Sequence, residues 1–249
     1  MTPGKVPARF AREFDGEGFP TAPASSIPAV TSEQMREIDR EAVEGFDLLL
    51  IQMMENAGVR LAELALRRFQ PETVAVLCGR AGNGGGGLVA ARHLANRGVR
   101  VAVTLGKDRS RLGDVPRHQL AILQRMAVPI GTEPVAAGLV LDALIGYSLR
   151  GDPHGRAAEL IRWANEHEAP VCSLDVPSGL DATTGEIGDP CVRAMATLTL
   201  ALPKTGLAGA PGVVGELYLA DISIPPALYS NIATQVDPIF ASGPILRLV

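Results

Sequence analysis

At 249 residues the chain is long for one domain and ordinary for a large α/β domain. Apolar residues make up 47% of it, which is enough for a substantial core, and 23 basic against 27 acidic side chains give a net charge of −4. That balance, with no long run of like charge, disfavours nucleic acid as a partner.

The first 28 residues are rich in Pro, Gly and small side chains and show no periodicity. They predict a flexible leader over residues 1–28, followed by a single domain over residues 29–249. The leader has no apolar segment typical of a secretion signal, and no run of about 18 apolar residues follows. The three cysteines are too scattered for a disulfide framework or a zinc site. We therefore expect a cytoplasmic protein that does not enter a membrane.

The domain is expected to begin with helices. Thr31 or Ser32 is a candidate N-cap, and apolar residues recur at helical spacing from Met35 onward. Gly45 and Gly58 interrupt this stretch, so we expect two or three helices rather than one.

Short apolar runs then alternate with helical segments. The predicted strands cover residues 73–78, 100–105, 139–144, 170–174 and 196–201, and the helices between them cover 88–96, 117–126 and 157–166. Residues 213–219 are predicted to form a final edge strand. Strands that are apolar throughout are typical of a parallel sheet buried on both faces. With right-handed crossovers, this order gives a doubly wound α/β sandwich.

A glycine-rich segment follows the first strand of this series. Residues 79–87 contain six glycines and precede a helix that we expect to begin at Leu88. Unobstructed backbone N–H groups at a helix N-terminus favour a phosphate, so the segment predicts a site for a phosphate-bearing nucleotide. It lacks the Lys-Ser/Thr pair of a P-loop, and the second strand does not end in an acidic residue, which disfavours hydride transfer.

Polar residues follow the later strands, where ligands bind in open parallel sheets. Asp142 lies in the third strand and needs a cation or hydrogen-bond donors, so it is either a ligand or a carboxylate that fixes a loop. Asp175 and Ser178 follow the fourth strand on a turn made rigid by Pro and Gly, and a carboxylate there could act as a general acid or base. Lys204, after the fifth strand, either supplies positive charge or lies on the surface.

Taken together, five segments resemble the YjeF N-terminal domain family, whose enzymatic members are NAD(P)H-hydrate epimerases. They are MMENAG at 53–58, the CG…NGG.GLVAARHL pattern at 78–94, DALIGYSLRGD at 142–152, DVPSGLDATTG at 175–185 and LPKTGL at 202–207. They occur in the family order at similar spacing.

The resemblance implies a Rossmann-like three-layer αβα sandwich with a mainly parallel central sheet. It also implies an enzyme that interconverts the R and S epimers of NAD(P)HX, the nicotinamide nucleotides hydrated at ring carbon 6. An NAD(P)HX dehydratase would then restore the normal cofactor. We expect functional coupling to such a dehydratase, and we expect a homodimer from the apolar N-terminal helices.

Carried over residue by residue, the resemblance assigns Asp175 as the acid/base carboxylate. It assigns Asn83, Asp142 and Ser178 as ligands of a potassium ion, whose hard character suits oxygen donors. The substrate-binding residues that we expect are Gly82, Asn83, Gly84, Gly85, Gly86, Gly146, Tyr147, Ser148, Leu149, Arg150, Gly151, Asp152 and Lys204.

The sequence departs from the family pattern in the glycine-rich segment. Gly82 stands where the family has Asn, and Gly86 stands where it has Asp. Loss of a buried charged acceptor weakens binding by about 1–3 kcal/mol. The alternative function is therefore a catalytically impaired nucleotide-binding or scaffold protein, as YjeF-N-like domains in eukaryotic decapping enhancers serve assembly. A different enzyme on the same frame, acting on another phosphorylated nucleotide, is a third reading.

Overall fold

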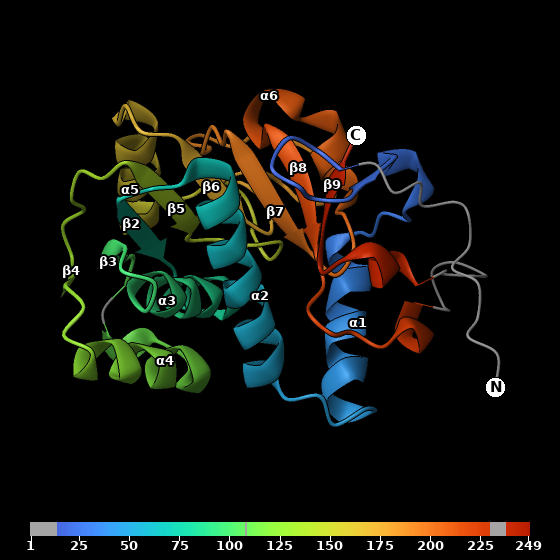
Figure 1. The fold of residues 1–249 in the computed structure, drawn as a ribbon, viewed down its shortest axis with the longest axis horizontal. Helices are drawn as coiled ribbons and strands as arrows, with labels where there is room; N and C mark the ends of the chain where they lie inside the picture. Colours follow the sequence, from blue (N-terminus) through green and yellow to red (C-terminus); the bar gives the residue numbers. More distant parts are fainter. Residues whose placement is uncertain (1–13, 108, 230–237) are drawn as a thin grey trace.

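The computed structural model describes residues 14–107, 109–229 and 238–249. Within these residues, nine strands form one sheet in the order β1-β9-β8-β7-β6-β5-β2-β3-β4 (Figure 1). The strands are β1 (Thr21–Ala22), β2 (Thr73–Cys78), β3 (Arg100–Leu105), β4 (Ile130–Gly131), β5 (Leu139–Ala143), β6 (Val171–Leu174), β7 (Ala196–Leu200), β8 (Glu216–Ala220) and β9 (Ile245–Leu248). The α-helices are α1 (Ser32–Glu44), α2 (Leu50–Leu64), α3 (Gly82–Ala95), α4 (Asp114–Arg125), α5 (Gly155–Glu166) and α6 (Pro211–Val214).

Seven neighbouring strands, β2 to β8, run parallel, and β9 pairs antiparallel with β8. From β2 the chain moves outward through β3 to β4 and then returns to β5 on the other side of β2. Strand order therefore reverses between β2 and β5. In sheets of this kind, the crevice outside the carboxyl ends of these two strands is where ligands bind.

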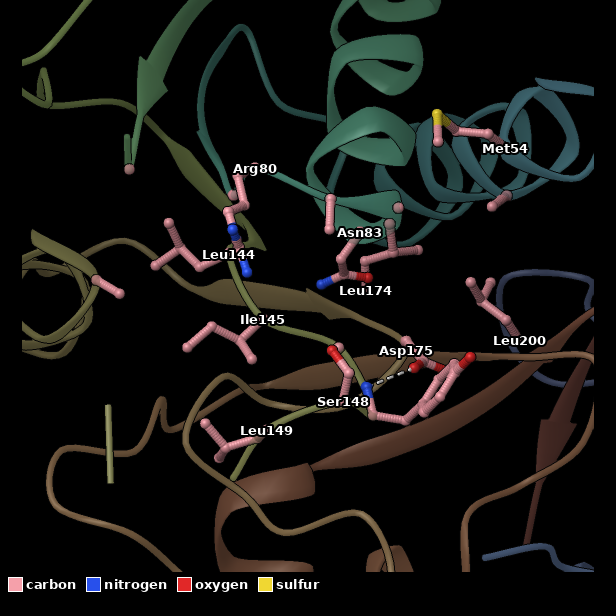
Figure 2. Close-up of a pocket in the computed structure, with 18 of the residues that line it drawn as sticks. Met54, Arg80, Asn83, Leu144, Ile145, Ser148, Leu149, Leu174, Asp175 and Leu200 are labelled. Carbon is pink, nitrogen blue, oxygen red and sulfur yellow. Dashed lines mark hydrogen bonds between the residues drawn. The ribbon is translucent and has the colours of Figure 1, made fainter. Parts of the chain in front are cut away.

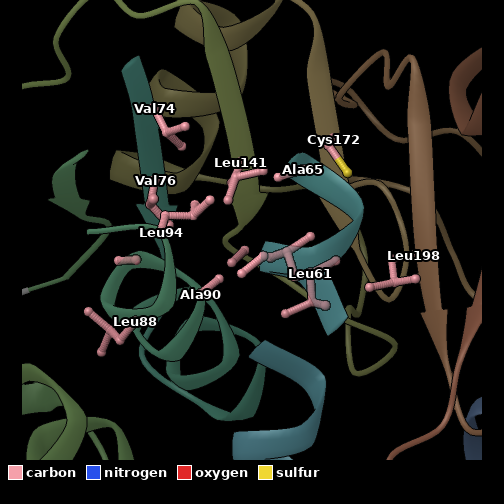
Figure 3. Close-up of a cluster of buried hydrophobic side chains, with 14 of the residues drawn as sticks. Leu61, Ala65, Val74, Val76, Leu88, Ala90, Leu94, Leu141, Cys172 and Leu198 are labelled. Atoms are coloured by element: carbon pink, nitrogen blue, oxygen red, sulfur yellow. The ribbon is translucent and has the colours of Figure 1, made fainter. Parts of the chain in front are cut away.

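Alternate residues of β2 are buried on opposite faces of the sheet. Val74 and Val76 join the cluster that contains α2, α3 and α4 side chains (Figure 3), whereas Ala75 and Leu77 pack against α5. Burial on both faces explains why the strand is apolar throughout. Helices on both faces of the sheet confirm the predicted three-layer sandwich.

The predicted strand and helix positions agree with the structure in most of the chain. The Thr31 side chain caps α1 in a capping box with Gln34, and α1 ends at the predicted Gly45. Gly58, however, lies inside α2 and ends no helix. The final strand is also displaced: Val213 and Val214 belong to α6, and β8 lies inside the sheet because β9 pairs along its outer side.

Residues 14–28 do not form the flexible leader that their composition suggested. β1 adds to the sheet beside β9, and the buried Phe19 ring lies 3.6 Å beneath the guanidinium carbon of Arg67. A two-residue strand is too short to produce an alternating pattern, and its partner is more than 200 residues away, so composition concealed it. Residues 1–13 lie outside the described residues.

Candidate active site

A cavity of about 720 Å³ opens at the carboxyl ends of β2, β3, β5 and β6 (Figure 2). Its wall comes from the loops after these strands and from α1 and α2. The lining residues at and after the strand ends are Gly79 to Ala81, Gly106, Lys107, Arg111, Leu144 to Arg150, Asp152 to His154, Leu174, Asp175, Leu200 and Ile222. Those from the α-helices are Asp39, Leu50, Met53, Met54, Ala57, Gly82, Asn83 and Ala157. The cavity therefore lies where the strand order reverses.

Less of the glycine-rich segment forms a loop than the sequence predicted. Helix α3 begins at Gly82 rather than at Leu88, and Gly84, Gly85 and Gly86 are buried within it. Only Gly82 and Asn83 of the five predicted binding residues in this segment line the cavity. Helix propensity predicted a loop, because four successive glycines destabilise a helix, but tertiary packing overrides that preference.

The buried glycines allow α3 to approach its neighbours closely. A Cβ on Gly85 would lie 2.0 Å from the Met54 sulfur of α2, and one on Gly86 would lie 2.7 Å from Leu174 Cδ2. Figure 2 shows Met54 and Leu174 on either side of the start of α3. The successive glycines thus mainly allow α3 to pack closely between α2 and the sheet, and the N-terminus of α3 lies at the cavity.

Asp142 is fully buried and receives four hydrogen bonds from protein donors. Ser173 and Ser178 donate their hydroxyl groups over 2.8 and 2.6 Å, and the backbone N–H groups of Ser178 and Leu144 donate over 2.9 and 3.2 Å. Burial nevertheless raises the pKa of the Asp142 carboxyl, and these hydrogen bonds oppose the rise. Asp142 therefore fixes the loops after β5 and β6 to one another.

Asp175 lies at a sharp turn directly after β6. Its φ angle is 71°, in the left-handed region that Asp tolerates better than most residues, and such backbone strain is common at functional sites. Its Oδ2 accepts a hydrogen bond of 3.1 Å from the backbone N–H of Tyr147. The position that a Cβ on Gly146 would take is 3.2 Å from the same Oδ2 and 3.4 Å from Asn83 Oδ1. Glycine at 146 therefore lets the two side chains face the same part of the cavity.

Lys204 is almost fully buried beside Asp175 rather than on the surface. Its Nζ lies 2.5 Å from Asp175 Oδ1 and donates to the Leu200 carbonyl over 2.8 Å. Asp175 Oδ1 has no hydrogen-bond partner among the described residues, so its contact with Lys204 is one of charge. Lys204 does not line the cavity, and it acts on Asp175 rather than on a ligand.

The segment after β5, which contains several of the predicted substrate-binding residues, supplies much of the cavity wall. Tyr147, Ser148, Leu149, Arg150 and Asp152 all line it, and Gly151 does not. Asp152 Oδ1 accepts a hydrogen bond from the Asp189 N–H over 3.0 Å and so also anchors a neighbouring loop.

Asp39 of α1 is a cavity residue that sequence reasoning missed. Its Oδ2 accepts a hydrogen bond of 2.6 Å from the Tyr147 hydroxyl, although the two residues are 108 positions apart. The sequence showed only a polar position on an amphipathic helix. The helical pattern did place Asp39 next to the buried Ile38, but no local signal pointed to a partner.

Four basic residues line the cavity from the segments after β2, β3 and β5. Arg80, Lys107, Arg111 and Arg150 line it, and none of them forms an ion pair within the part of the chain that the structure describes. The N–H groups at the start of α3 open on the same space. Basic side chains and helix N-termini are groups that bind phosphate in other proteins. The sequence predicted Arg150 but not the other three.

The oxygen atoms of Asn83, Asp142 and Ser178 suit a hard monovalent cation chemically. The Asn83 amide nitrogen is buried and has no hydrogen-bond partner among the described residues, whereas Asp142 and Ser178 bind each other. The Ser178 hydroxyl also contacts the backbone of Ile145, next to Gly146. The three side chains therefore lie along the Leu144–Gly146 backbone, and a cation there would share Asp142 and Ser178 with these hydrogen bonds.

None of the described helices has both the length and the apolar character needed to cross a membrane.

Comparison with known proteins points to one family. The model for the YjeF-related protein N-terminus matches residues 50–206. An NAD(P)H-hydrate epimerase of Dehalogenimonas lykanthroporepellens is 49% identical over 92% of this chain and 96% of its own length, and one of Truepera radiovictrix is 37% identical over 88% and 100%. A bifunctional NAD(P)H-hydrate repair enzyme of Moorella thermoacetica is 38% identical over 83% of this chain, which matches 42% of that enzyme.

The crystal structure of the yeast protein ynu0 shares the fold, with a TM-score of 0.78 and 24% identity over 88% of this chain and 99% of that one. The predicted Rossmann-like architecture agrees with this likeness. The matched segment includes α2, the start of α3, Asp142, Asp175 and Lys204. The chain belongs to the family of the YjeF-related protein N-terminus.

Proposed function

We propose that this chain is an NAD(P)H-hydrate epimerase, an isomerase that interconverts the R and S forms of NAD(P)HX in nicotinamide nucleotide repair. The observation that carries the proposal is the Asp175 carboxylate, fixed in a cavity that four basic residues also line. Two stand-alone relatives with that name cover nearly all of the chain.

The cavity accounts for both ends of such a substrate. The unpaired basic residues and the start of α3 would hold the pyrophosphate, which places the hydrated nicotinamide toward Asp175. Asp175 would move a proton at the substituent on ring carbon 6, and a positioned carboxylate of this kind accelerates a reaction about 10²–10⁴-fold. The test is an assay in which the protein mixes the separated R and S epimers.

We further propose a potassium ion held by Asn83, Asp142 and Ser178. The amide, carboxylate and hydroxyl oxygens of the three residues, which lie near one stretch of backbone, support it. When bound, the ion would supply positive charge beside the cavity. Raising potassium chloride should increase the melting temperature more than the same concentration of choline chloride. Asn83→Ala should abolish that difference.

We propose the cytoplasm as the compartment and functional coupling to an NAD(P)HX dehydratase. All three cysteines are free and buried, which suits a reducing compartment, and relatives such as that of Moorella thermoacetica are named bifunctional repair enzymes. A homodimer remains a proposal. The exposed Phe46, Leu49 and Leu50 where α1 meets α2 support it, and light scattering tests it.

The alternative is a YjeF-N-like nucleotide-binding or scaffold protein without catalysis. The departure at Gly86 favours it, because Leu174 fills the space that a side chain there would need. Incubation of the protein with one pure epimer of NADHX distinguishes the two functions. A scaffold that binds NADHX leaves the epimer unchanged, whereas an epimerase produces a mixture of the two epimers.

A further inference from the structure

Asp39 and Asp175 lie at the same end of the cavity and are joined through Tyr147. The Tyr147 backbone N–H binds Asp175, and its hydroxyl binds Asp39 over 2.6 Å. The Tyr147 ring centroid is 5.9 Å from Lys204 Nζ, the ammonium group that pairs with Asp175. One residue therefore fixes two carboxylates relative to each other.

We propose that Asp39, acting with the Tyr147 hydroxyl, is a second proton-transfer group of this site and works as the acid while Asp175 works as the base. This inference rests on the proposed epimerase function. It adds a residue for which the sequence indicated no role.

The reaction gives a physical reason for two groups. To invert carbon 6, the hydroxyl must leave from one face of the ring and return to the other. The C6–O bond breaks as the oxygen takes a proton from an acid and leaves as water, while the ring nitrogen lone pair forms a C=N bond. Water then adds to the opposite face: a new O–C6 bond forms, the C=N pair returns to nitrogen, and a base takes the proton. Atoms and electrons balance, and no oxidant is needed.

The surroundings of the two carboxylates favour this division of roles. The ammonium group of Lys204, 2.5 Å away, stabilises negative charge on Asp175. Burial raises the pKa of the Asp39 carboxyl, and the negative charge of Asp175 raises it further. The hydrogen bond from Tyr147 and the charge of the more distant Lys204 oppose this rise. These different surroundings suit the two carboxylates to separate roles in proton transfer.

The groups around Asp39 come from five parts of the chain, and two of them are positively charged. They are Tyr147 after β5, Asp175 after β6, Lys204 after β7 and Tyr229 of the 3-10 helix η5 (Pro226–Tyr229), with Arg36 one turn earlier on α1. Burial and the Asp39 charge raise the pKa of the Tyr147 phenol, so it stays neutral and can carry a proton between Asp39 and the substrate.

The other carboxylates near the cavity, Asp142 and Asp152, accept hydrogen bonds from backbone groups of neighbouring loops. Asp142 is fully buried beneath four hydrogen bonds, and Asp152 accepts a bond from the Asp189 backbone. Asp39, by contrast, lines the cavity, and the Tyr147 hydroxyl is its one hydrogen-bond donor among the described residues.

The experiment measures kcat/KM for epimerisation of NADHX against pH for the wild type, Asp39→Asn, Tyr147→Phe and the control Glu33→Gln, an exposed acid on the same helix. Both test variants should lose about 10²-fold or more, with unchanged melting temperatures. The wild type should lose activity as pH rises through the raised pKa of Asp39. In Asp39→Asn the residual rate should lack this decline.

The outcomes separate the two claims. Suppose that the wild type is active and that Asp39→Asn keeps both the wild-type rate and the decline at high pH. This result overturns the inference and leaves the epimerase proposal standing. A wild type that binds NADHX by calorimetry but mixes no epimers overturns the epimerase proposal, and this inference falls with it. Epimerisation in ¹⁸O water that introduces no label at carbon 6 also overturns the inference, since the step requires exchange of the hydroxyl with solvent.

Discussion

Asp175 and Lys204 form a buried ion pair, with 2.5 Å between Oδ1 and Nζ and side chains that are 4% and 1% exposed. Burial of two charges is costly, and the pair repays that cost only while both partners are present. The pair therefore ties stability to the same residue that we assign to proton transfer.

Lys204→Met should leave a buried, uncompensated carboxylate. We expect the free energy of unfolding to fall by about 3–5 kcal/mol in urea denaturation. The double variant Lys204→Met, Asp175→Asn should be more stable than the sum of the single effects predicts, because no charge is left unpaired. Strictly additive effects would show that the pair has no energetic coupling.

Restoring the family residues should have opposite results at the two glycines. The Cβ of Gly82→Asn meets no atom within 4 Å, so this variant should fold normally and bind NADHX more tightly by about 0.5–1.5 kcal/mol for a regained hydrogen bond. Gly86→Asp places its Cβ 2.7 Å from Leu174 Cδ2 and should destabilise by about 1–3 kcal/mol. Thermal melts with calorimetry check both, and a Gly86→Asp variant as stable as the wild type would refute the packing argument.

Gly58→Ala should destabilise, although alanine normally stabilises a helix interior by about 0.5–1 kcal/mol relative to glycine. The new Cβ would lie 2.4 Å from Val89 Cβ of α3 and 2.6 Å from the Gly86 carbonyl oxygen. The matched control is Gly212→Ala, whose Cβ meets nothing within 4 Å. Equal melting temperatures for the two variants would contradict the close contact between α2 and α3.

Glu216 should make the free energy of unfolding depend on pH in the acidic range. The Arg68 guanidinium binds both of its carboxylate oxygens, and this hydrogen bonding lowers the pKa of Glu216. The pKa of Glu216 in the folded protein is below its value of about 4.3 in the unfolded chain. The ionised Glu216 therefore contributes fully to the free energy of unfolding above about pH 4.3, and this contribution is lost as the pH falls through the folded pKa. Glu216→Gln should therefore lower the unfolding free energy at pH 7, and its deficit should disappear in acid. A deficit that is constant across this range would argue against the linkage.

The sequence predicted the parts of this protein that depend on local pattern. β2 and β3 match their predicted bounds, because a strand buried on both faces is apolar at every position. Asp142, Asp175 and Ser178 were expected at strand ends, and the structure places them there. Lys204 was left between two roles because its burial depends on packing around β7, which no local pattern records.

Features that depend on distant contacts were not predictable. Asp39 acquires its role only when α1 meets Tyr147, 108 residues later. The glycine run looked like a loop because its low helix propensity is offset only by close packing against Met54 and Leu174. The strand β1 exists only because β9 lies beside it.

The most direct test of the account is the fate of pure R-NADHX mixed with the protein and an S-specific dehydratase. The wild type should allow all of the substrate to be consumed, because Asp175 continuously converts R to S. Asp175→Asn keeps the shape of the side chain but removes the proton-transfer group, so it should slow consumption about 10²–10⁴-fold at a temperature where the variant is still fully folded. Full consumption by that variant at the wild-type rate, or none by the wild type beyond the spontaneous rate, would contradict the account.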